Sequence, residues 1–487
     1  IPAIENGGEC QIEEIGRFDS LAQKSEYEWT GLARVSERVW VEAMMLRISR
    51  LRIILRKGIG VLFGEWHRQR RGAARLVREV KLFRDTVELP PNIWIFLDHP
   101  ERADDNAEHL FRYVQAHHPE ISAYFLLNRD SHDWERLKTD GFNLLEYGSV
   151  KAHAATLSAR FVLSSDATGA CMFPAPRGLF GSPDYDFVFL QHGVLINDIS
   201  SWIRGKTISY CVSSTEDEYR AFVWKESRYD LLDTQIILSG LPRFDALLQK
   251  ADQSQEDLSQ SPKRLLIMPT WRMDLSRGFA AATSHSERVE LVDKSDFGAA
   301  WSELLRHPHL LELVRSGDLS VTFMLHPSMP SELFQGFDGG DVDFVSVASA
   351  RFQDLLVNCD LFVTDYSSLA FDAAYIDKPV GYFQFDEANM RSGGHSWTPG
   401  YFDYRSMGLG PVHRTTDETA SWIRRVVAAG CSVDGIFQDR VRQTFAHHDR
   451  SNSARVVHAL QAVQKGVSLV ESQRLPASVL PPLISST

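Results

Sequence analysis

Four polar clusters each follow a run of apolar residues, and their residue types suit acid–base and phosphate chemistry. The clusters are Gln191-His192-Gly193, Pro269-Thr270-Trp271-Arg272, His326-Pro327 and Asp365-Tyr366-Ser367-Ser368. A histidine followed by glycine presents an imidazole beside flexible backbone, a good arrangement for a general base. A guanidinium can neutralise phosphate, and serines at a helix start stand beside unpaired N–H groups that bind it.

Each cluster also has a structural interpretation. The sequence holds 17 histidines, and a lone histidine is usually structural or at the surface. Arg272 can stack on Trp271 in a packed corner, and two serines at a helix start are caps in most proteins. Taken singly, the clusters leave both interpretations open.

The elements that must position these clusters form a regular pattern. From Asn92 onward, short apolar runs alternate with amphipathic helical patterns, which is typical of parallel α/β units. The runs that predict strands are 92–97, 123–127, 143–147, 160–165, 186–191, 208–213, 235–240, 264–270, 320–326, 343–347, 361–364 and 380–385. A polar stretch over 250–263 predicts a linker between two such halves. We therefore expect a two-lobed enzyme whose cleft lies between the carboxyl edges of two sheets.

Five segments follow from this pattern. Residues 1–31 are poorly defined, 32–90 form a basic amphipathic helical segment, and 437–487 form a closing helix and tail. Residues 91–250 predict a Rossmann-like lobe on the acceptor side, and residues 251–436 predict a second Rossmann-like lobe on the donor side.

Composition excludes several classes of protein. The 487 residues are 44% hydrophobic and 24% charged, an ordinary balance for a globular protein with more than one domain. The five cysteines lie far apart without a CxxC spacing, which argues for reduced thiols in a cytoplasmic protein and against a zinc site. No apolar run approaches the roughly 20 residues that span a bilayer.

Charge is concentrated near the start of the chain. Residues 32–84 contain 14 Lys or Arg and four Glu, a net charge of +10, whereas the whole chain carries −12. Apolar residues are interleaved with these arginines, a composition typical of helices that lie on anionic membranes or acidic polymers. The alternative is a solvated basic face packed on the acidic remainder of the chain.

From Asn92 to Gln464 the sequence resembles the CDP-glycerol glycerophosphotransferase family of teichoic acid and capsule synthesis. The motifs that carry the resemblance are DDNAEHLFRYV (104–114), YGSVKAHAATLSARFVLSSD (147–166), QHG (191–193), SGLPRFDALL (239–248), PTWR (269–272), LHP (325–327), DLFVTDYSSLAFDAAYIDKPVGYFQFD (360–386) and PGYFDYRSMGLGP (399–411). The 360–386 and 399–411 motifs are the strongest, because they are long and rich in polar positions that a fold alone does not dictate.

The resemblance implies a GT-B-like α/β fold and transfer of glycerol phosphate from CDP-glycerol to a hydroxyl of a membrane-linked acceptor. It makes His192 the candidate base, while His326, Thr270, Arg272, Ser367 and Ser368 bind the donor phosphates. Supporting positions are Asp166, Gly193, Arg243, Asp365 and Asp372. Asp365 is expected to orient the turn rather than to touch an anion.

Several expectations concern partners. We expect no cofactor, no required metal and no nucleic acid, and a location on the inner face of the cell membrane.

Relatives follow the HG pair with a lysine-containing segment, whereas the first basic residues here are Arg204 and Lys206. The alternatives are ribitol-phosphate transfer or a GT-B glycosyltransferase and, less favoured, a sugar-nucleotide epimerase or a non-catalytic polymer-binding module.

Overall fold

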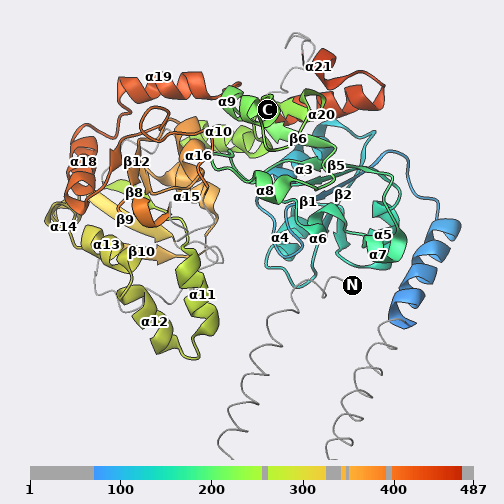
Figure 1. Cartoon of the computed structure of the whole chain (residues 1–487), viewed down its shortest axis with the longest axis horizontal. Helices are drawn as coiled ribbons and strands as arrows, with labels where there is room; N and C mark the ends of the chain where they lie inside the picture. Colours follow the sequence, from blue (N-terminus) through green and yellow to red (C-terminus); the bar gives the residue numbers. More distant parts are fainter. Residues whose placement is uncertain (1–70, 255–261, 325–341, 347–349, 391–397, 474–487) are drawn as a thin grey trace, which may run out of the picture. The chain divides into compact units, whose positions relative to one another are not determined.

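The computed structural model describes residues 71–254, 262–324, 342–346, 350–390 and 398–473 (Figure 1). The chain divides into two compact units. The smaller unit is residues 1–88 with 175–183, and its described parts are a helix over residues 71–86 and α7 (Arg177–Phe180). The larger unit, residues 89–174 and 184–487, contains both β-sheets.

The first sheet is parallel and has seven strands in the order β3-β2-β1-β4-β5-β6-β7. We call residues 89–174 and 184–254 the first lobe. Its strands are β1 (Ile93–Leu97), β2 (Ser122–Leu127), β3 (Leu144–Glu146), β4 (Ala159–Ser164), β5 (Asp186–Phe189), β6 (Tyr210–Ser213) and β7 (Ile236–Leu238). Its helices are α3 (Asn106–His117), α4 (Trp134–Thr139), α5 (Val150–Thr156), α6 (Gly169–Met172), α8 (Ser200–Ile203), α9 (Glu216–Val223), η1 (Asp233–Gln235) and α10 (Pro242–Ser254).

The second sheet is also parallel and has six strands in the order β10-β9-β8-β11-β12-β13. We call residues 262–428 the second lobe. Its strands are β8 (Lys263–Ile267), β9 (Leu319–Met324), β10 (Val342–Val345), β11 (Leu361–Thr364), β12 (Val380–Phe383) and β13 (Val412–His413). Its helices are α11 (Met273–Ala281), α12 (His285–Asp293), α13 (Asp296–Leu305), α14 (Pro308–Arg315), α15 (Phe352–Asn358), α16 (Leu369–Tyr375), α17 (Glu387–Asn389) and α18 (Thr416–Ala428).

The central strands are buried on both faces, which explains why they read as continuous apolar runs in the sequence. All residues of β1, β11 and β12 are buried. In each sheet the strand order reverses beside the first strand, between β1 and β4 and between β8 and β11. Ligands of such folds bind beyond the carboxyl ends of the strands at this reversal. Three of the four predicted polar clusters follow β5, β8 and β11, so each of these lies at a carboxyl edge, and the fourth, His326-Pro327, lies outside the described residues.

Two expectations about the connections need correction. The predicted linker over 250–263 is partly helical, because α10 continues to Ser254 with Ala251 buried among core residues. The closing helix is two helices, α19 (Gly435–Thr444) and α20 (Asn452–Gln464), followed by α21 (Leu469–Ser472). The break between α19 and α20 places Asp449 against Tyr375, whose hydroxyl donates to the Asp449 carbonyl at 2.7 Å.

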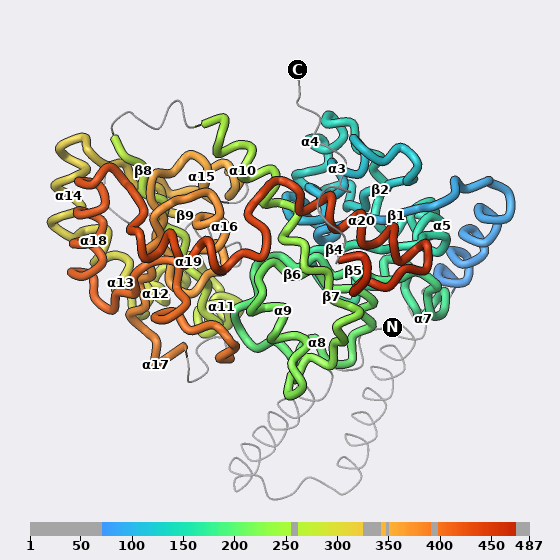
Figure 2. The backbone as a smooth tube through the Cα atoms, turned by 90° about the horizontal axis from the view of Figure 1, so that it is seen from above, coloured from blue at the N-terminus to red at the C-terminus, as the bar shows by residue number. Residues whose placement is uncertain are grey.

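Helix α20, near the end of the described residues, returns to the first lobe. Helix α20 packs on α3 and α10, and α10 in turn contacts α15 and α16 of the second lobe (Figure 2). Helix α10 therefore lies between the helices of the two sheets. The missed strand β13 has two residues, too few for a period of two to show in the sequence.

Candidate active site

The loop after β5 presents His192 on a backbone that is fixed from both sides. His192 is exposed, while Gln191 before it is buried and has φ of 62°, an uncommon value for a residue with a side chain. The amide Nδ2 of Asn106 donates to the Gln191 carbonyl at 2.8 Å. This strained turn holds its shape because its neighbours fix it, a feature often found at functional sites.

Glu218 on α9 holds the same loop through hydrogen bonds. Its Oε1 accepts from Gln191 Nε2 at 3.1 Å and from the Leu195 backbone N–H at 2.6 Å, so it holds the loop on both sides of His192. Its Oε2 accepts from the Ser214 N–H at 2.8 Å. Burial raises the pKa of Glu218, and these hydrogen bonds oppose that rise. A buried carboxyl group with so many donors is a positioning device.

Gly193 brings this loop against the second lobe. A Cβ placed on Gly193 would lie 2.4 Å from the Ser368 Oγ and 3.8 Å from the Arg243 Nη2. No side chain fits there without a shift, so the glycine permits the close approach of the two lobes. The structure thus brings the turn beside His192 close to Ser368, one of the two predicted phosphate-binding serines.

Arg243, at the start of α10, is buried between the lobes with 1% of its side chain exposed. Its Nε and Nη2 donate to the two carboxylate oxygens of Asp372 on α16 at 2.7 and 2.8 Å. Its Nη1 donates to Asp105 Oδ1 and to the His192 carbonyl, both at 2.7 Å. Burial alone would lower the pKa of Arg243, but the charges of Asp372 and Asp105 outweigh it and raise that pKa.

A second buried arginine organises the turn that precedes the serines. Arg272 donates from Nη2 to Asp365 at 2.8 Å, from Nε to Asp386 at 2.8 Å and from Nη1 to the Thr270 carbonyl at 2.6 Å. Asp365 also accepts from the backbone N–H groups of Thr270 and Tyr366 at 2.8 and 2.7 Å. The expected orienting role of Asp365 agrees with these contacts. Because carboxylates already occupy the Arg272 guanidinium, they favour its structural interpretation over direct phosphate binding.

The two serines have different local roles. Ser367 Oγ accepts from the Leu369 N–H at 3.2 Å, which is a turn contact at the start of α16. Ser368 is the N-cap residue but makes no side-chain capping hydrogen bond. The buried Thr270 Oγ1 has no hydrogen-bond partner among the described residues. Neither hydroxyl is thus committed to a hydrogen bond among the described residues, although that of Thr270 is buried.

Other predicted positions lie elsewhere. His326 lies outside the described residues, so its donor-binding role stays a prediction. Asp166, after β4, accepts from the Thr168 N–H at 2.7 Å and shapes the turn before α6. The sequence analysis did not identify Asp105, Asn106, Glu218 or Asp386, whose hydrogen bonds hold the loops that carry the predicted site residues. Asp105, Asn106 and Asp386 lie within the motifs at 104–114 and 360–386, whereas no local pattern indicates a role for Glu218.

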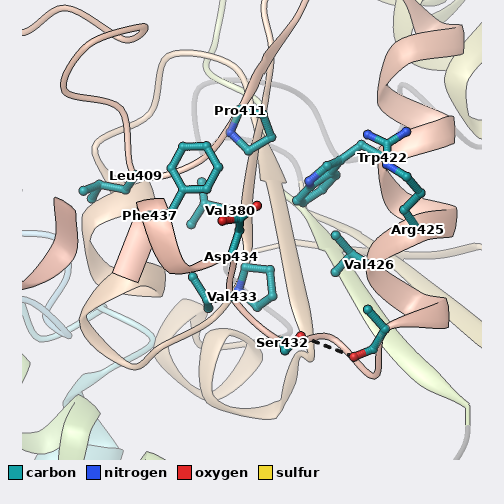
Figure 3. A pocket seen from close by; sticks show the side chains of 12 residues that line it. Val380, Leu409, Pro411, Trp422, Arg425, Val426, Ser432, Val433, Asp434 and Phe437 are labelled. Carbon is teal, nitrogen blue, oxygen red and sulfur yellow. Dashed lines mark hydrogen bonds between the residues drawn. The ribbon is translucent and has the colours of Figure 1, made fainter. Parts of the chain in front are cut away.

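A pocket of about 390 Å³ opens at the amino end of β12, between α18 and α19 (Figure 3). It is lined by Val380, Pro411, Trp422 and Phe437 among others, and the side chains of Arg425 and Asp434 lie at it. It contains none of the predicted site residues. Because the site residues follow the carboxyl ends of strands, this pocket lies at the other edge of the second sheet.

Among the residues that the structure describes, no three His, Cys, Asp or Glu side chains come together as a metal site, so independence from metal stays a prediction. No helix in those residues has both the length and the apolar character to cross a bilayer.

Comparison with known proteins identifies relatives for most of the chain. The model of the CDP-glycerol:poly(glycerophosphate) glycerophosphotransferase family matches residues 81–462. The minor teichoic acid biosynthesis protein GgaB of Bacillus subtilis is 30% identical over 76% of this chain. The teichoic acid poly(glycerol phosphate) polymerase of the same organism is 28% identical over 47% of it. The chain spans 39% and 28% of the lengths of these two relatives.

The fold has a close counterpart among solved structures. The wall teichoic acid polymerase TagF superposes with a TM-score of 0.56 at 16% identity, over 84% of this chain and 97% of that one. At this identity the similarity concerns the fold alone. The two parallel sheets with their helices form the GT-B-like architecture predicted from the sequence.

Proposed function

The chain belongs to the CDP-glycerol:poly(glycerophosphate) glycerophosphotransferase family, and on this premise we propose that it transfers glycerol phosphate from CDP-glycerol to a hydroxyl of a teichoic acid or capsule-type acceptor, releasing CMP. The observation that carries this proposal is the contact of the His192 loop with Ser368 through Gly193. It unites a candidate base with candidate phosphate ligands from positions far apart in the sequence.

In the proposed reaction an acceptor hydroxyl attacks the β-phosphorus of CDP-glycerol. A new O–P bond forms, the bond to the α-phosphate oxygen breaks, and CMP leaves with the electron pair. The His192 imidazole accepts the proton of the hydroxyl, a role worth roughly 10² to 10⁴ in rate. Its exposure fits this role, since the acceptor must reach it.

The donor side rests on the turn that follows β11. Ser367, Ser368 and the Thr270 hydroxyl are proposed to hold the donor phosphates, together with the predicted His326. Phosphoryl transfer depends mainly on holding the reacting groups in line and stabilising negative charge. Asp365 and Arg272 shape this turn through their hydrogen bonds, and a direct contact of Arg272 with the donor stays a prediction.

Product identification tests the proposal. The protein is incubated with CDP-glycerol, CDP-ribitol or UDP-sugars and a short polyol-phosphate acceptor, and the released nucleotide is identified. We expect CMP from CDP-glycerol, and release of UDP from a UDP-sugar would instead support the glycosyltransferase alternative. CMP release from CDP-ribitol alone would change the transferred group but not the reaction class.

Replacement of His192 tests its role as base. His192→Ala should lower turnover by roughly 10² to 10⁴ and leave CDP-glycerol affinity unchanged. The matched control is His132→Ala, because the His132 side chain is 57% exposed and pairs with Asp133, which is not a predicted site residue. An equal loss of donor affinity in calorimetry, or unchanged turnover, would remove His192 from the acceptor side.

We further propose that the basic segment over residues 32–84 docks the protein on an anionic membrane surface. The support is its net charge of +10 in a chain of −12, together with its interleaved apolar residues. Each basic residue near such a surface contributes about 1 kcal/mol. Binding to anionic vesicles should weaken with salt and disappear when residues before Val87 are deleted, while turnover on a short acceptor persists. Undiminished vesicle binding by the shortened protein would contradict the proposal.

A further inference from the structure

Arg243 joins three separate parts of the molecule through one guanidinium. Its partners are Asp372 on α16, Asp105 before α3 and the backbone carbonyl of His192, at distances of 2.7 to 2.8 Å. The Arg243 and Asp372 side chains are 1% and 0% exposed. Such a fork with fixed geometry specifies position as well as charge, and a lysine cannot reproduce it.

The partner that matters most is the carbonyl of His192 itself. A hydrogen bond to this carbonyl fixes the peptide plane between His192 and Gly193, directly beside the Cα that carries the imidazole. The peptide plane on the other side of His192 is set by Gln191, whose carbonyl is bound by Asn106 at 2.8 Å. Asn106 Oδ1 also accepts from the backbone N–H of Arg243 at 3.1 Å. The two peptide planes that flank His192 are therefore held by Asn106 at the start of α3 and Arg243 at the start of α10, and these two residues are hydrogen-bonded to each other.

The Arg243 guanidinium also binds Asp372 on α16, the helix that begins directly after the two serines. Ser368 and Asp372 are four residues apart at the start of α16, so they lie on the same helix face. That face meets the first lobe twice, because Ser368 contacts Gly193 and Asp372 binds Arg243. Any movement of α16 is thus transmitted directly to the backbone of His192.

We propose that Arg243 is a positioning residue that sets the His192 imidazole relative to the phosphate-binding serines by tying both to α16. The inference rests on the proposed function, since it assigns a geometry to that reaction. Arg243 touches neither donor nor acceptor. A misplacement of about 1 Å at the reacting groups lowers rates by about 10²-fold, which sets the scale of the expected effect.

The test compares conservative substitutions in two ion pairs between the lobes. Arg243→Lys keeps the charge but loses the fork, and Asp372→Asn keeps the shape but loses the charge on the partner. The control is Arg351→Lys, because Arg351 of the second lobe pairs with Asp104 of the first without contacting the His192 loop. Each variant is measured for melting temperature, donor dissociation constant, kcat and KM.

We expect Arg243→Lys to lower kcat by about 10²-fold, with a cooperative melt and a donor dissociation constant within about twofold of the original. Asp372→Asn should give a smaller loss of kcat, and Arg351→Lys should change kcat by less than about twofold. The proposal is overturned if Arg243→Lys retains kcat, or if Arg351→Lys loses as much. It is also overturned if the loss in Arg243→Lys only parallels loss of folded protein.

A readout that needs no turnover separates this inference from the proposed function. The Cε1–H resonance of His192, assigned by its disappearance in His192→Gln, reports the surroundings of the imidazole. We expect it to shift in Arg243→Lys and to stay in place in Arg351→Lys. A missing CMP product with a shifted resonance would contradict the proposed function and leave the coupling intact. An unshifted resonance would contradict the coupling whatever the activity.

Discussion

Arg243 and Arg272 are both buried guanidinium groups whose positive charge is balanced by carboxylates, but they lie in two different places. Each is buried and is held between two carboxylates, Asp105 and Asp372 for Arg243, and Asp365 and Asp386 for Arg272. The carboxylates of Arg243 belong to different lobes, whereas those of Arg272 both follow strands of the second lobe. The first arginine therefore sets the relation between two sheets, and the second builds one loop at the edge of one sheet.

Their other neighbours are similar in kind. The Arg272 guanidinium lies 5.2 to 5.7 Å from the rings of Phe297, Tyr366 and Phe385, so aromatic packing completes its shell. Burial would lower its pKa, but Asp365 and Asp386 outweigh that effect and raise it. Arg243 likewise lies 5.7 and 5.9 Å from the rings of Phe352 and Phe244. Both arginines also donate to a backbone carbonyl, which is that of Thr270 for Arg272 and that of His192 for Arg243. Loss of either arginine should therefore cost stability, because each leaves buried carboxylates unpaired, whereas loss of Arg243 should in addition lower the reaction rate.

Removal of Arg272 should produce a large change in stability. Arg272→Ala leaves Asp365 and Asp386 buried without a counter-charge, and breaking such a group costs about 3–5 kcal/mol of unfolding free energy. Denaturant unfolding measures this loss. Arg220→Ala is the control, because Arg220 pairs with Glu216 at 3.5 Å, both side chains are more than half exposed, and such pairs contribute about 1 kcal/mol or less. Equal losses in the two variants would contradict the structural role of Arg272.

Acid should weaken the boundary between the lobes through His109. Its Nε2 lies 2.7 Å from Gln353 Nε2 of the second lobe, and burial lowers the pKa of His109 from 6.5 to about 3. Glu108 opposes this shift, whereas Arg351, Arg112 and Lys250 add to it. The neutral ring stabilises the fold fully above pH 6.5, and that contribution is lost as pH falls toward 3.

Stability measured at several pH values between 7 and 5 tests this expectation. The loss due to His109 approaches about 1.4 kcal/mol for each pH unit below its unfolded pKa. His109→Gln should remove that part of the slope, while His132→Gln, at an exposed position, should keep it. A slope that is the same in all three proteins would show that His109 does not titrate on unfolding.

The serines should give the smallest change in stability. Ser367→Ala removes one turn contact and should cost about 0.5–1 kcal/mol, whereas Ser368→Ala, which removes no capping hydrogen bond, should cost less. Both should weaken CDP-glycerol binding if the hydroxyls hold phosphate. Paired melting curves and calorimetry distinguish the two roles, and preserved donor affinity in the double variant would restrict the serines to a local structural role.

Much of the fold was predictable because its signals are local. The twelve predicted strands all occur. The central ones stand out most, since strands buried on both faces need runs of apolar residues. The clusters at the strand ends were predictable for the same reason, because a polar residue after a buried strand is placed by the strand itself. The end of α10 was misjudged, since its exposed face is as polar as a linker.

The sequence by itself determined the two α/β lobes, the order of their elements and the residues that stand at the sheet edges. Only the tertiary structure decided which of these residues meet. Arg243 and Asp372 are 129 residues apart in the sequence. No local pattern predicts that Arg243 binds this carboxylate and the His192 carbonyl. Glu218 carries no signal at all, because a buried carboxyl group resembles a surface one until its donors surround it. Hydrophobic periodicity is a property of neighbouring residues in the sequence, whereas the partners of a buried charge are set by packing between elements.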